Sequence, residues 1–250
     1  DEVKADGFDL VDDFSDLFGM NAAGTDAKMR NTKESILEAQ FTPGAGNWCT
    51  WMFGRDLVNW NNNFTWAKWV TPSRDLISTF KQEGDEVRFK ESVVYYDCGW
   101  SNYYPSDNYP FMYKCRSANS SIIKYRYADV LLLKAEALIM QDTPDLEGAA
   151  DIIDEVRDRA KLGALSSSTR SNKDALLNAL LKERRLELAF EGQRWFDLVR
   201  LDKVEEVMNA VHAKDSGRKA QVYTYDKNSY RLPIPQSVID ANDKIHQNPG

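Results

Sequence analysis

A charged run at residues 183–200 constrains the fold of this chain more than any other part of it. Glu183, Glu187 and Glu191 are four residues apart, a spacing that stacks them along one face of an α-helix. Three neighbouring carboxylates repel one another unless cations lie among them or opposite them. The run itself supplies four cations that we predict as their partners, namely Arg184, Arg185, Arg194 and Arg200.

Gly192 stands where we expect the first helix of this run to end, since glycine adopts the left-handed backbone conformation that closes many helices. A second helix is expected to begin near Arg194 and to carry an apolar face, formed by Trp195, Phe196, Leu198 and Val199. We therefore predict a helical hairpin held by ion pairs. A carboxylate–guanidinium cluster can also be catalytic, but structural ion-pair networks are the commoner case.

Residues 122–213 have the apolar spacing of a helical scaffold. We predict a first helix near residues 125–141, which is apolar over most of its circumference and therefore expected to pack between neighbours. Its small residues Ala128, Ala135 and Ala137 would let another helix approach closely.

Two further helices are predicted before the charged run. One would begin at Thr143 as the N-cap, with Pro144 at the first helical position, and end at Gly163. The next would begin between residues 172 and 174. No sequence repeat with a period of 34 residues is present, so periodicity alone does not indicate a tetratricopeptide array.

The remaining segments are less regular. Residues 1–33 are expected to form loop with one or two short helices, and residues 42–121 a large irregular region. We predict short strands at 35–41 and 93–96 and a helix at 73–83. Residues 214–250 are expected to be an extended tail that wraps a surface, with Gln221–Tyr225 extended, because prolines 233, 235 and 249 interrupt regular pairing.

Composition excludes several classes of function. The net charge of −7 argues against nucleic acid as a partner, because phosphates require a basic patch. Phosphate-loop, dinucleotide, nucleophile-elbow and zinc-protease motifs are absent from the sequence, so no cofactor and no catalytic residue are predicted. Two histidines and three cysteines without a paired spacing do not indicate a metal site. Cys98 and Cys115 are either free buried thiols or a disulfide, and the sequence leaves both open.

Two segments concentrate aromatic and amide side chains. Tryptophans gather between residues 48 and 69 beside several asparagines, and tyrosines with a further tryptophan between residues 95 and 113. Flat rings match the apolar face of a sugar, and amides match its hydroxyl rim. Core packing is the alternative for any single ring, above all for Trp69. The predicted glycan-binding residues are Trp48, Trp51, Trp60, Asn61, Asn63, Trp66, Trp100, Tyr103 and Tyr104.

Several motifs, in the same order, resemble the SusD/RagB family of outer-membrane nutrient-binding lipoproteins. They are the charged run itself, Lys124–Leu138 (KYRYADVLLLKAEAL), Val156–Ala160 (VRDRA), Arg231–Pro235 (RLPIP) and Gln247–Gly250 (QNPG), with Gly7–Val11 and Asp16–Phe18 fitting a segment that the family places in mid-chain. The resemblance covers nearly all of the 250 residues. It implies a mainly α fold of tetratricopeptide-like helical hairpins with a loop-rich region and a few short strands.

The resemblance also implies a function. Family members are lipid-anchored at the cell surface, bind oligosaccharide without cleaving it and pass it to a SusC-like TonB-dependent transporter. No anchor cysteine or signal precedes Gly7, so we expect this chain to be the C-terminal half of a longer protein, with membrane contact only through an anchor outside it. Residues 1–121 would then face the ligand, 122–213 form the scaffold and 214–250 the tail. The alternatives are a helical scaffold that binds protein and, ranked last, a glycoside hydrolase.

Overall fold

The computed structural model of the chain describes residues 2–42, 46, 70–98, 104–214 and 224–248. By internal contacts the chain divides into two compact units, residues 1–192 and 193–250, which are described separately below. Within the described residues the protein is mainly helical with a few short strands, which confirms the predicted fold class.

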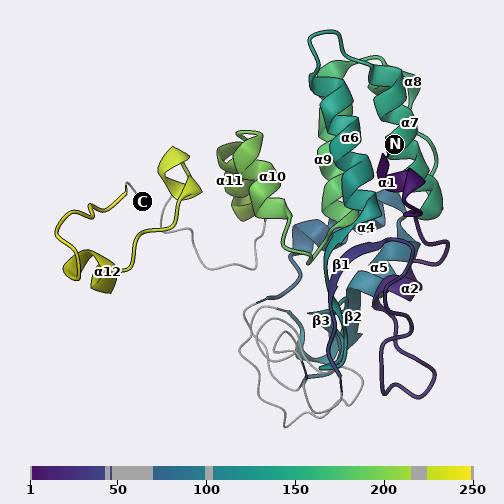
Figure 1. The fold of residues 1–250 in the computed structure, drawn as a ribbon, viewed down its shortest axis with the longest axis horizontal. Coiled ribbons are helices and arrows are strands. Elements are labelled where there is room, and N and C mark those ends of the chain that lie inside the picture. The colour runs from purple at the N-terminus through teal and green to yellow at the C-terminus, as the bar shows by residue number, and fades with distance from the viewer. Residues whose placement is uncertain (1, 43–45, 47–69, 99–103, 215–223, 249–250) are drawn as a thin grey trace. The chain divides into compact units, whose positions relative to one another are not determined.

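Three helices that stand side by side form the core of the first unit (Figure 1). They are α6 (Tyr127–Met140), α7 (Leu146–Arg159) and α9 (Lys173–Glu187), with the short α8 (Ser167–Arg170) between the last two. α6 contacts both α7 and α9. Wholly buried aliphatic side chains from all three fill the space between them: Leu132, Ala135, Ile139, Ala149, Ile153, Val156, Leu176 and Leu180.

The start of α9 is as predicted, because the Asn172 side chain accepts a hydrogen bond from the N–H of Ala175. The start of α7 differs. Asp145, not Thr143, is the N-cap, and its carboxylate accepts the N–H of Gly148 at 2.9 Å. Two capping residues lie close together here, and the helix begins after the second of them.

The predicted end of α7 at Gly163 is also wrong. Lys161 adopts a left-handed conformation (φ 60°), and its N–H donates to the carbonyl of Asp158 at 2.8 Å. The N–H of Leu162 donates to the carbonyl of Arg157 at 2.9 Å. These two bonds satisfy carbonyls of the last helical turn, so the helix has ended before the chain reaches Gly163.

Two small antiparallel sheets lie in the same unit. β1 (Ser35–Ala39) pairs with β4 (Ile122–Arg126), which runs directly into α6, and β2 (Val93–Tyr96) pairs with β3 (Tyr109–Met112). The predicted strands at 35–41 and 93–96 are therefore confirmed, the first ending at Ala39.

Short helices complete the described part of the unit. α1 (Glu2–Ala5) and α2 (Ser15–Phe18) are the short N-terminal helices that the sequence predicts. α4 (Arg74–Glu83) begins at the N-cap Ser73, and α5 (Glu86–Ser92) follows it after the N-cap Asp85. A 3₁₀ turn, η1 (Ser106–Asn108), precedes β3.

The first helix of the charged run ends earlier than predicted. α9 ends at Glu187, one turn before Gly192, and both Phe190 (φ 65°) and Gly192 (φ 83°) are left-handed. The chain therefore leaves the helical path before Glu191, and this carboxylate turns toward cations of other elements, described below, instead of continuing the helical face.

The second unit contains α10 (Arg194–Arg200), α11 (Val204–Lys214), η2 (Lys227–Tyr230) and α12 (Gln236–Asp240). Amide side chains hold the described part of its tail. Asn209 accepts the N–H of Tyr225 and donates to its carbonyl, each at 3.0 Å. Gln247 accepts the N–H of Ile234 at 2.8 Å and donates to its carbonyl at 2.9 Å. Gln221–Tyr225 lies largely outside the described residues, and the wrapping of the tail around a surface stays a prediction.

Candidate functional site

The three glutamates of the charged run converge on one buried cluster in the first unit. Glu187 lies at its centre and is fully buried. Its Oε2 accepts from Arg88 Nη1 at 3.0 Å, and its Oε1 accepts from Arg126 and Arg159. Three guanidinium groups therefore surround one carboxylate.

The other members extend the cluster on both sides. Arg88 also bonds Glu183 at 2.5 Å and Asp85 at 2.6 Å. Glu34, from the loop before β1, accepts from Arg126 Nη1 at 2.6 Å and from Arg159 Nη1 at 3.0 Å. We call this set the central ion cluster: Glu34, Asp85, Glu183, Glu187, Glu191, Arg88, Arg126, Arg157, Arg159 and Lys114.

Glu191 and Lys114 form one edge of the central ion cluster. Arg126 binds Glu191 with two parallel bonds, Nε to Oε2 at 2.7 Å and Nη2 to Oε1 at 2.9 Å. Lys114 Nζ donates to Glu191 Oε1 at 2.6 Å and to the carbonyl of Glu187 at 2.8 Å. The ring of Phe14, wholly buried, lies 4.8 Å from Arg159 Cζ and 5.2 Å from Lys114 Nζ, close enough for cation–π attraction.

These partners correct the sequence prediction. Arg184 pairs with Asp129 at 2.8 Å and Arg185 with Asp75 at 2.7 Å, while Arg200 pairs with Asp197 at 2.8 Å within α10 of the second unit. Local arginines were predicted because helical spacing brings neighbours together. On α9, however, Arg184 and Arg185 lie on other faces than the glutamates. Ion pairing is confirmed, but the cations come from α5, β4, α7 and the loop after β3.

Burial and charge move the pKa values of the cluster in opposite directions. For Glu187, burial alone would raise the pKa, but Arg159, Arg126 and Arg88 outweigh it and hold the pKa well below its ordinary value. For Glu183, which has fewer cations around it, burial prevails and raises the pKa. Burial lowers the pKa of Lys114 to about 8, against the opposing charge of Glu191.

The geometry of the cluster suits a structural role better than a catalytic one. A general acid or base needs a route to substrate, and Glu183 and Glu187 are wholly buried with their oxygens engaged by guanidinium groups. The structural interpretation of the charged run therefore has geometric support. Arg126 and Arg159 are residues that sequence reasoning missed as partners, although both lie inside the motifs named above.

A second feature lies where the two aromatic-rich segments rejoin the scaffold. Tyr104 Oη donates to the carbonyl of Pro72 at 2.7 Å, and the Tyr109 hydroxyl lies 2.9 Å from Thr71 Oγ1. The Tyr104 ring packs edge-on against Tyr109, with centroids 5.7 Å apart, and Arg74 Cζ lies 4.4 Å from its centroid. The chain after residue 69 and the chain after residue 103 are therefore tied together.

Of the predicted glycan-binding residues, only Tyr104 lies within the described part of the chain. It is half-buried, and its hydroxyl is used to hold Pro72. The others lie outside the described residues: Trp48, Trp51, Trp60, Asn61, Asn63, Trp66, Trp100 and Tyr103. Trp69, the ring expected in the core, does too. Their role stays a prediction.

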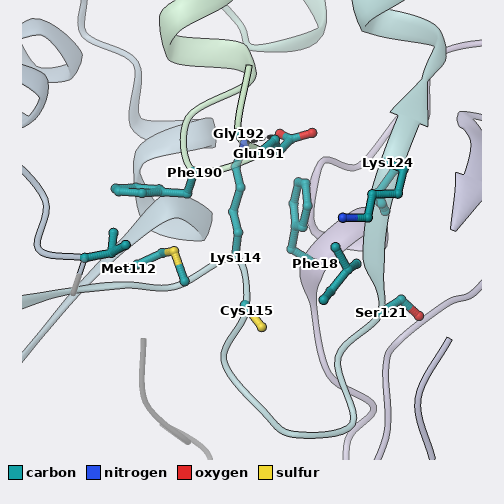
Figure 2. Close-up of a pocket in the computed structure, with 12 residues that line it drawn as sticks. Phe18, Met112, Lys114, Cys115, Ser121, Lys124, Phe190, Glu191 and Gly192 are labelled. Carbon is teal, nitrogen blue, oxygen red and sulfur yellow. Dashed lines mark hydrogen bonds and ion pairs between the residues drawn. The ribbon is translucent and has the colours of Figure 1, made fainter. Parts of the chain in front are cut away.

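A cavity of about 400 Å³ adjoins this region (Figure 2). Lys114 runs through its wall toward Glu191, with Phe190 and Met112 on one side and Phe18 on the other. Val70, the first described residue after the tryptophan-rich segment, also lines it. The sequence carried no local signal for this cavity, because its walls come from α2, β3, β4 and the turn after α9.

Cys98 and Cys115 are both buried, and no disulfide joins the two within the described residues. Among the described residues, no cluster of histidine, cysteine and carboxylate side chains has the arrangement of a metal site. Within the same residues, no helix combines the length and apolarity needed to cross a membrane.

Comparison with known proteins agrees with the resemblance in the motifs. A model of the SusD family matches residues 106–250. SusD-like protein P38 from Formosa agariphila is 41% identical over 106 residues, which are 40% of this chain and 21% of that protein. SusD-like protein P2 from the same organism is 34% identical over 141 residues, 54% of this chain and 27% of that protein.

The fold has close counterparts among solved structures. Surface glycan-binding protein A from Bacteroides thetaiotaomicron, in complex with laminarihexaose, superposes with a TM-score of 0.72 at 20% identity. The match covers 100% of this chain and 58% of that one. The chain thus spans little more than half the length of a structure that it resembles throughout.

Proposed function

Because the chain belongs to the SusD family, we propose that it carries the glycan-binding face of a cell-surface protein that captures oligosaccharide by aromatic stacking and hydrogen bonding. The observation that carries this proposal is the junction of Tyr104 with Pro72 and of Tyr109 with Thr71. It ties Thr71 and Pro72, which follow the tryptophan-rich segment, to Tyr104 and Tyr109 of the tyrosine-rich segment. Flat rings and amides from both segments would suit a chain of several sugar rings.

In this proposal the helices and the central ion cluster hold the scaffold, and the two aromatic-rich segments bind the glycan. The similar surface glycan-binding protein A, solved in complex with laminarihexaose, supports an oligosaccharide as the ligand class. For two or three stacked rings, we expect a dissociation constant of about 10 μM to 1 mM.

Calorimetry on Trp60→Ala and Trp100→Ala tests the platform. Loss of one stacked ring should weaken binding of the best ligand in a polysaccharide screen by about tenfold. Phe196→Ala is the matched control, since Phe196 is an aromatic side chain that is 66% exposed on α10, outside both segments. Undiminished binding in both tryptophan variants would remove these residues from the site.

Capture without cleavage and transfer to a TonB-dependent transporter complete the proposal. Non-enzymatic binding predicts no release of reducing ends from any polysaccharide that the chain binds. Transfer predicts that the chain, or the longer protein that contains it, is recovered with a SusC-like transporter from detergent-solubilised outer membranes. Reducing-end release would instead support the hydrolase alternative. Recovery of the transporter without any glycan affinity would support a protein-binding scaffold.

A further inference from the structure

The cavity beside Lys114 is separate from the proposed glycan site. Tyr104, the predicted glycan-binding residue within the described part of the chain, does not line it. The wall is largely apolar and includes Phe18, Val70, Met112, Ile123 and Phe190. Its volume of about 400 Å³ is typical of small-molecule pockets. Because a water molecule takes up about 30 Å³ in the liquid, the cavity has room for about a dozen non-hydrogen atoms.

Two of the charged side chains in the wall neutralise each other. Lys114 Nζ lies 2.6 Å from Glu191 Oε1, and both residues are buried. They belong to the central ion cluster, in which Arg126 also binds Glu191. Neither charge is therefore available to a molecule in the cavity, and Lys114 contributes its aliphatic stem to the wall.

Lys124 is different. It lines the cavity from β4, but its side chain is exposed, so it marks a place where the cavity meets solvent. In the view of Figure 2, the side chain extends from the strand toward Phe18. Lys124 has no hydrogen bond or ion pair with any part of the chain that the structure describes. The wall therefore carries one ammonium group whose charge is not compensated.

The cavity offers little to a sugar. Ser121 has the only hydroxyl group among the described lining residues, and it already accepts from Arg30 Nη1 at 2.7 Å. A saccharide carries a hydroxyl on most of its carbons, and each one that is buried without a partner costs binding free energy. The lining favours a molecule that is apolar over most of its length and has a negative charge at one end.

We propose that this cavity binds a medium-chain carboxylate, with the apolar chain between Phe18, Met112 and Phe190 and the carboxylate beside Lys124. An exposed lysine lets the carboxylate keep part of its hydration, which avoids the large cost of burying a charge. The chain is the source of affinity, and Lys124 determines which end faces solvent. The site goes beyond the proposed function, since it uses neither aromatic-rich segment.

Calorimetry on residues 1–250 with linear carboxylates from hexanoate to tetradecanoate tests the size of the site. Affinity should rise about fourfold with each added methylene group while the cavity fills. The rise should stop near decanoate, which has about a dozen non-hydrogen atoms, because further methylene groups find no wall. A rise that continues to tetradecanoate would indicate adsorption to apolar surface and would overturn the proposal, as would no binding of any chain length.

A lysine substitution tests the carboxylate end. Lys124→Gln should weaken decanoate about fivefold, the upper limit for an ion pair at an exposed side chain, and leave 1-decanol unchanged. Lys81→Gln is the matched control, because it removes the same charge from an exposed position on α4 that does not line the cavity. Both variants should unfold thermally like the wild type. Equal decanoate affinity in Lys124→Gln and wild type would refute the role of Lys124.

Methionine methyl groups report where the chain binds. Met112 lines the cavity, whereas Met140 on α6 is 53% exposed and does not. In a protein labelled with methyl-¹³C methionine, decanoate should shift the Met112 signal and leave the Met140 signal in place. Met112→Leu and Met140→Leu assign the two signals. An unchanged Met112 signal at saturating decanoate would place the ligand elsewhere and overturn the proposal. No polysaccharide enters these measurements, so their outcome is independent of glycan binding.

Discussion

Replacement of Glu187 by glutamine should strongly destabilise the chain. Glu187 is fully buried, and its two oxygens accept from Arg88, Arg126 and Arg159. In the central ion cluster, the five carboxylates of Glu34, Asp85, Glu183, Glu187 and Glu191 balance the five cations Arg88, Arg126, Arg157, Arg159 and Lys114. The neutral amide leaves one positive charge uncompensated and turns an N–H₂ toward guanidinium donors.

The magnitude follows from the cost of a broken buried pair. Removal of one partner costs about 3–5 kcal/mol, because the remaining charge stays buried. Glu187 forms ion pairs with three cations, so we expect the free energy of unfolding to fall by an amount in that range. For a chain of this size, 1 kcal/mol corresponds to about 2–4 °C, so Tm should fall by about 6–20 °C.

Thermal and urea unfolding followed by circular dichroism at pH 7 measure this loss. Glu147→Gln is the matched control, because Glu147 pairs with Arg170 while its side chain stays 72% exposed, and it should not change Tm measurably. Glycan affinity of the folded Glu187→Gln variant should equal that of the wild type. An unfolding curve like that of the wild type, with binding lost, would refute the structural role of the cluster.

Acid provides an independent check on the same residue. The native pKa of Glu187 is well below its ordinary value of 4.5, so its contribution is complete above about pH 4.5 and is lost as pH falls through the native pKa. The difference in unfolding free energy between wild type and Glu187→Gln should therefore shrink below pH 4.5. A constant difference down to pH 2 would contradict this assignment.

Three further predictions follow from local structure. Lys114 has a native pKa of about 8 and an unfolded pKa of 10.5, so the unfolded chain binds more protons between these two pH values. The free energy of unfolding should therefore rise from pH 8 to 9.5. Urea titrations should find this rise in the wild type and not in Lys114→Met. Asp145→Ala should lower the free energy of unfolding by about 0.5–2 kcal/mol, because it removes the N-cap of α7. Thr143→Ala should cause no measurable change. The reverse order in urea unfolding would support Thr143 as the N-cap, as the sequence predicts. Cys98, which is 2% exposed, should resist iodoacetamide in the native chain and react after denaturation. Peptide mapping that finds it joined to Cys115 would contradict the absence of a disulfide between the two.

The helices were predictable because their signals are local. Apolar spacing placed α4 almost to the residue and the start of α9 within two residues. Helix ends were harder where a run offers more than one candidate. Thr143 and Asp145 are both good caps, and the left-handed residue after α7 is Lys161, a residue type that gives no such signal.

The partners of the charged run were not predictable from spacing. Helical geometry determines that Glu183 and Glu187 share a face, but not which distant segment lies against that face. Arg88, Arg126 and Arg159 reach it only through the tertiary arrangement of α5, β4 and α7. The same reason applies to the cavity beside Lys114, whose lining residues carry no common sequence pattern.

The predicted glycan site depends on composition, and this limits how far it could be specified. Rings and amides indicate a type of ligand, but their orientation depends on loops whose conformation has no periodic signal. The structure adds the junction at Tyr104 and Pro72, which no pattern in the sequence indicated.

The central ion cluster also bears on how the chain folds. Its bonds join residues far apart in sequence: Arg126 to Glu187 across 61 positions, Arg88 to Glu187 across 99, and Arg159 to Glu34 across 125. Closing such long loops is slow, and no helix pair can shelter these charges from water until the distant segments arrive. The helices can therefore form early while the glutamates remain hydrated, and the last step of folding brings all the opposite charges out of solvent together.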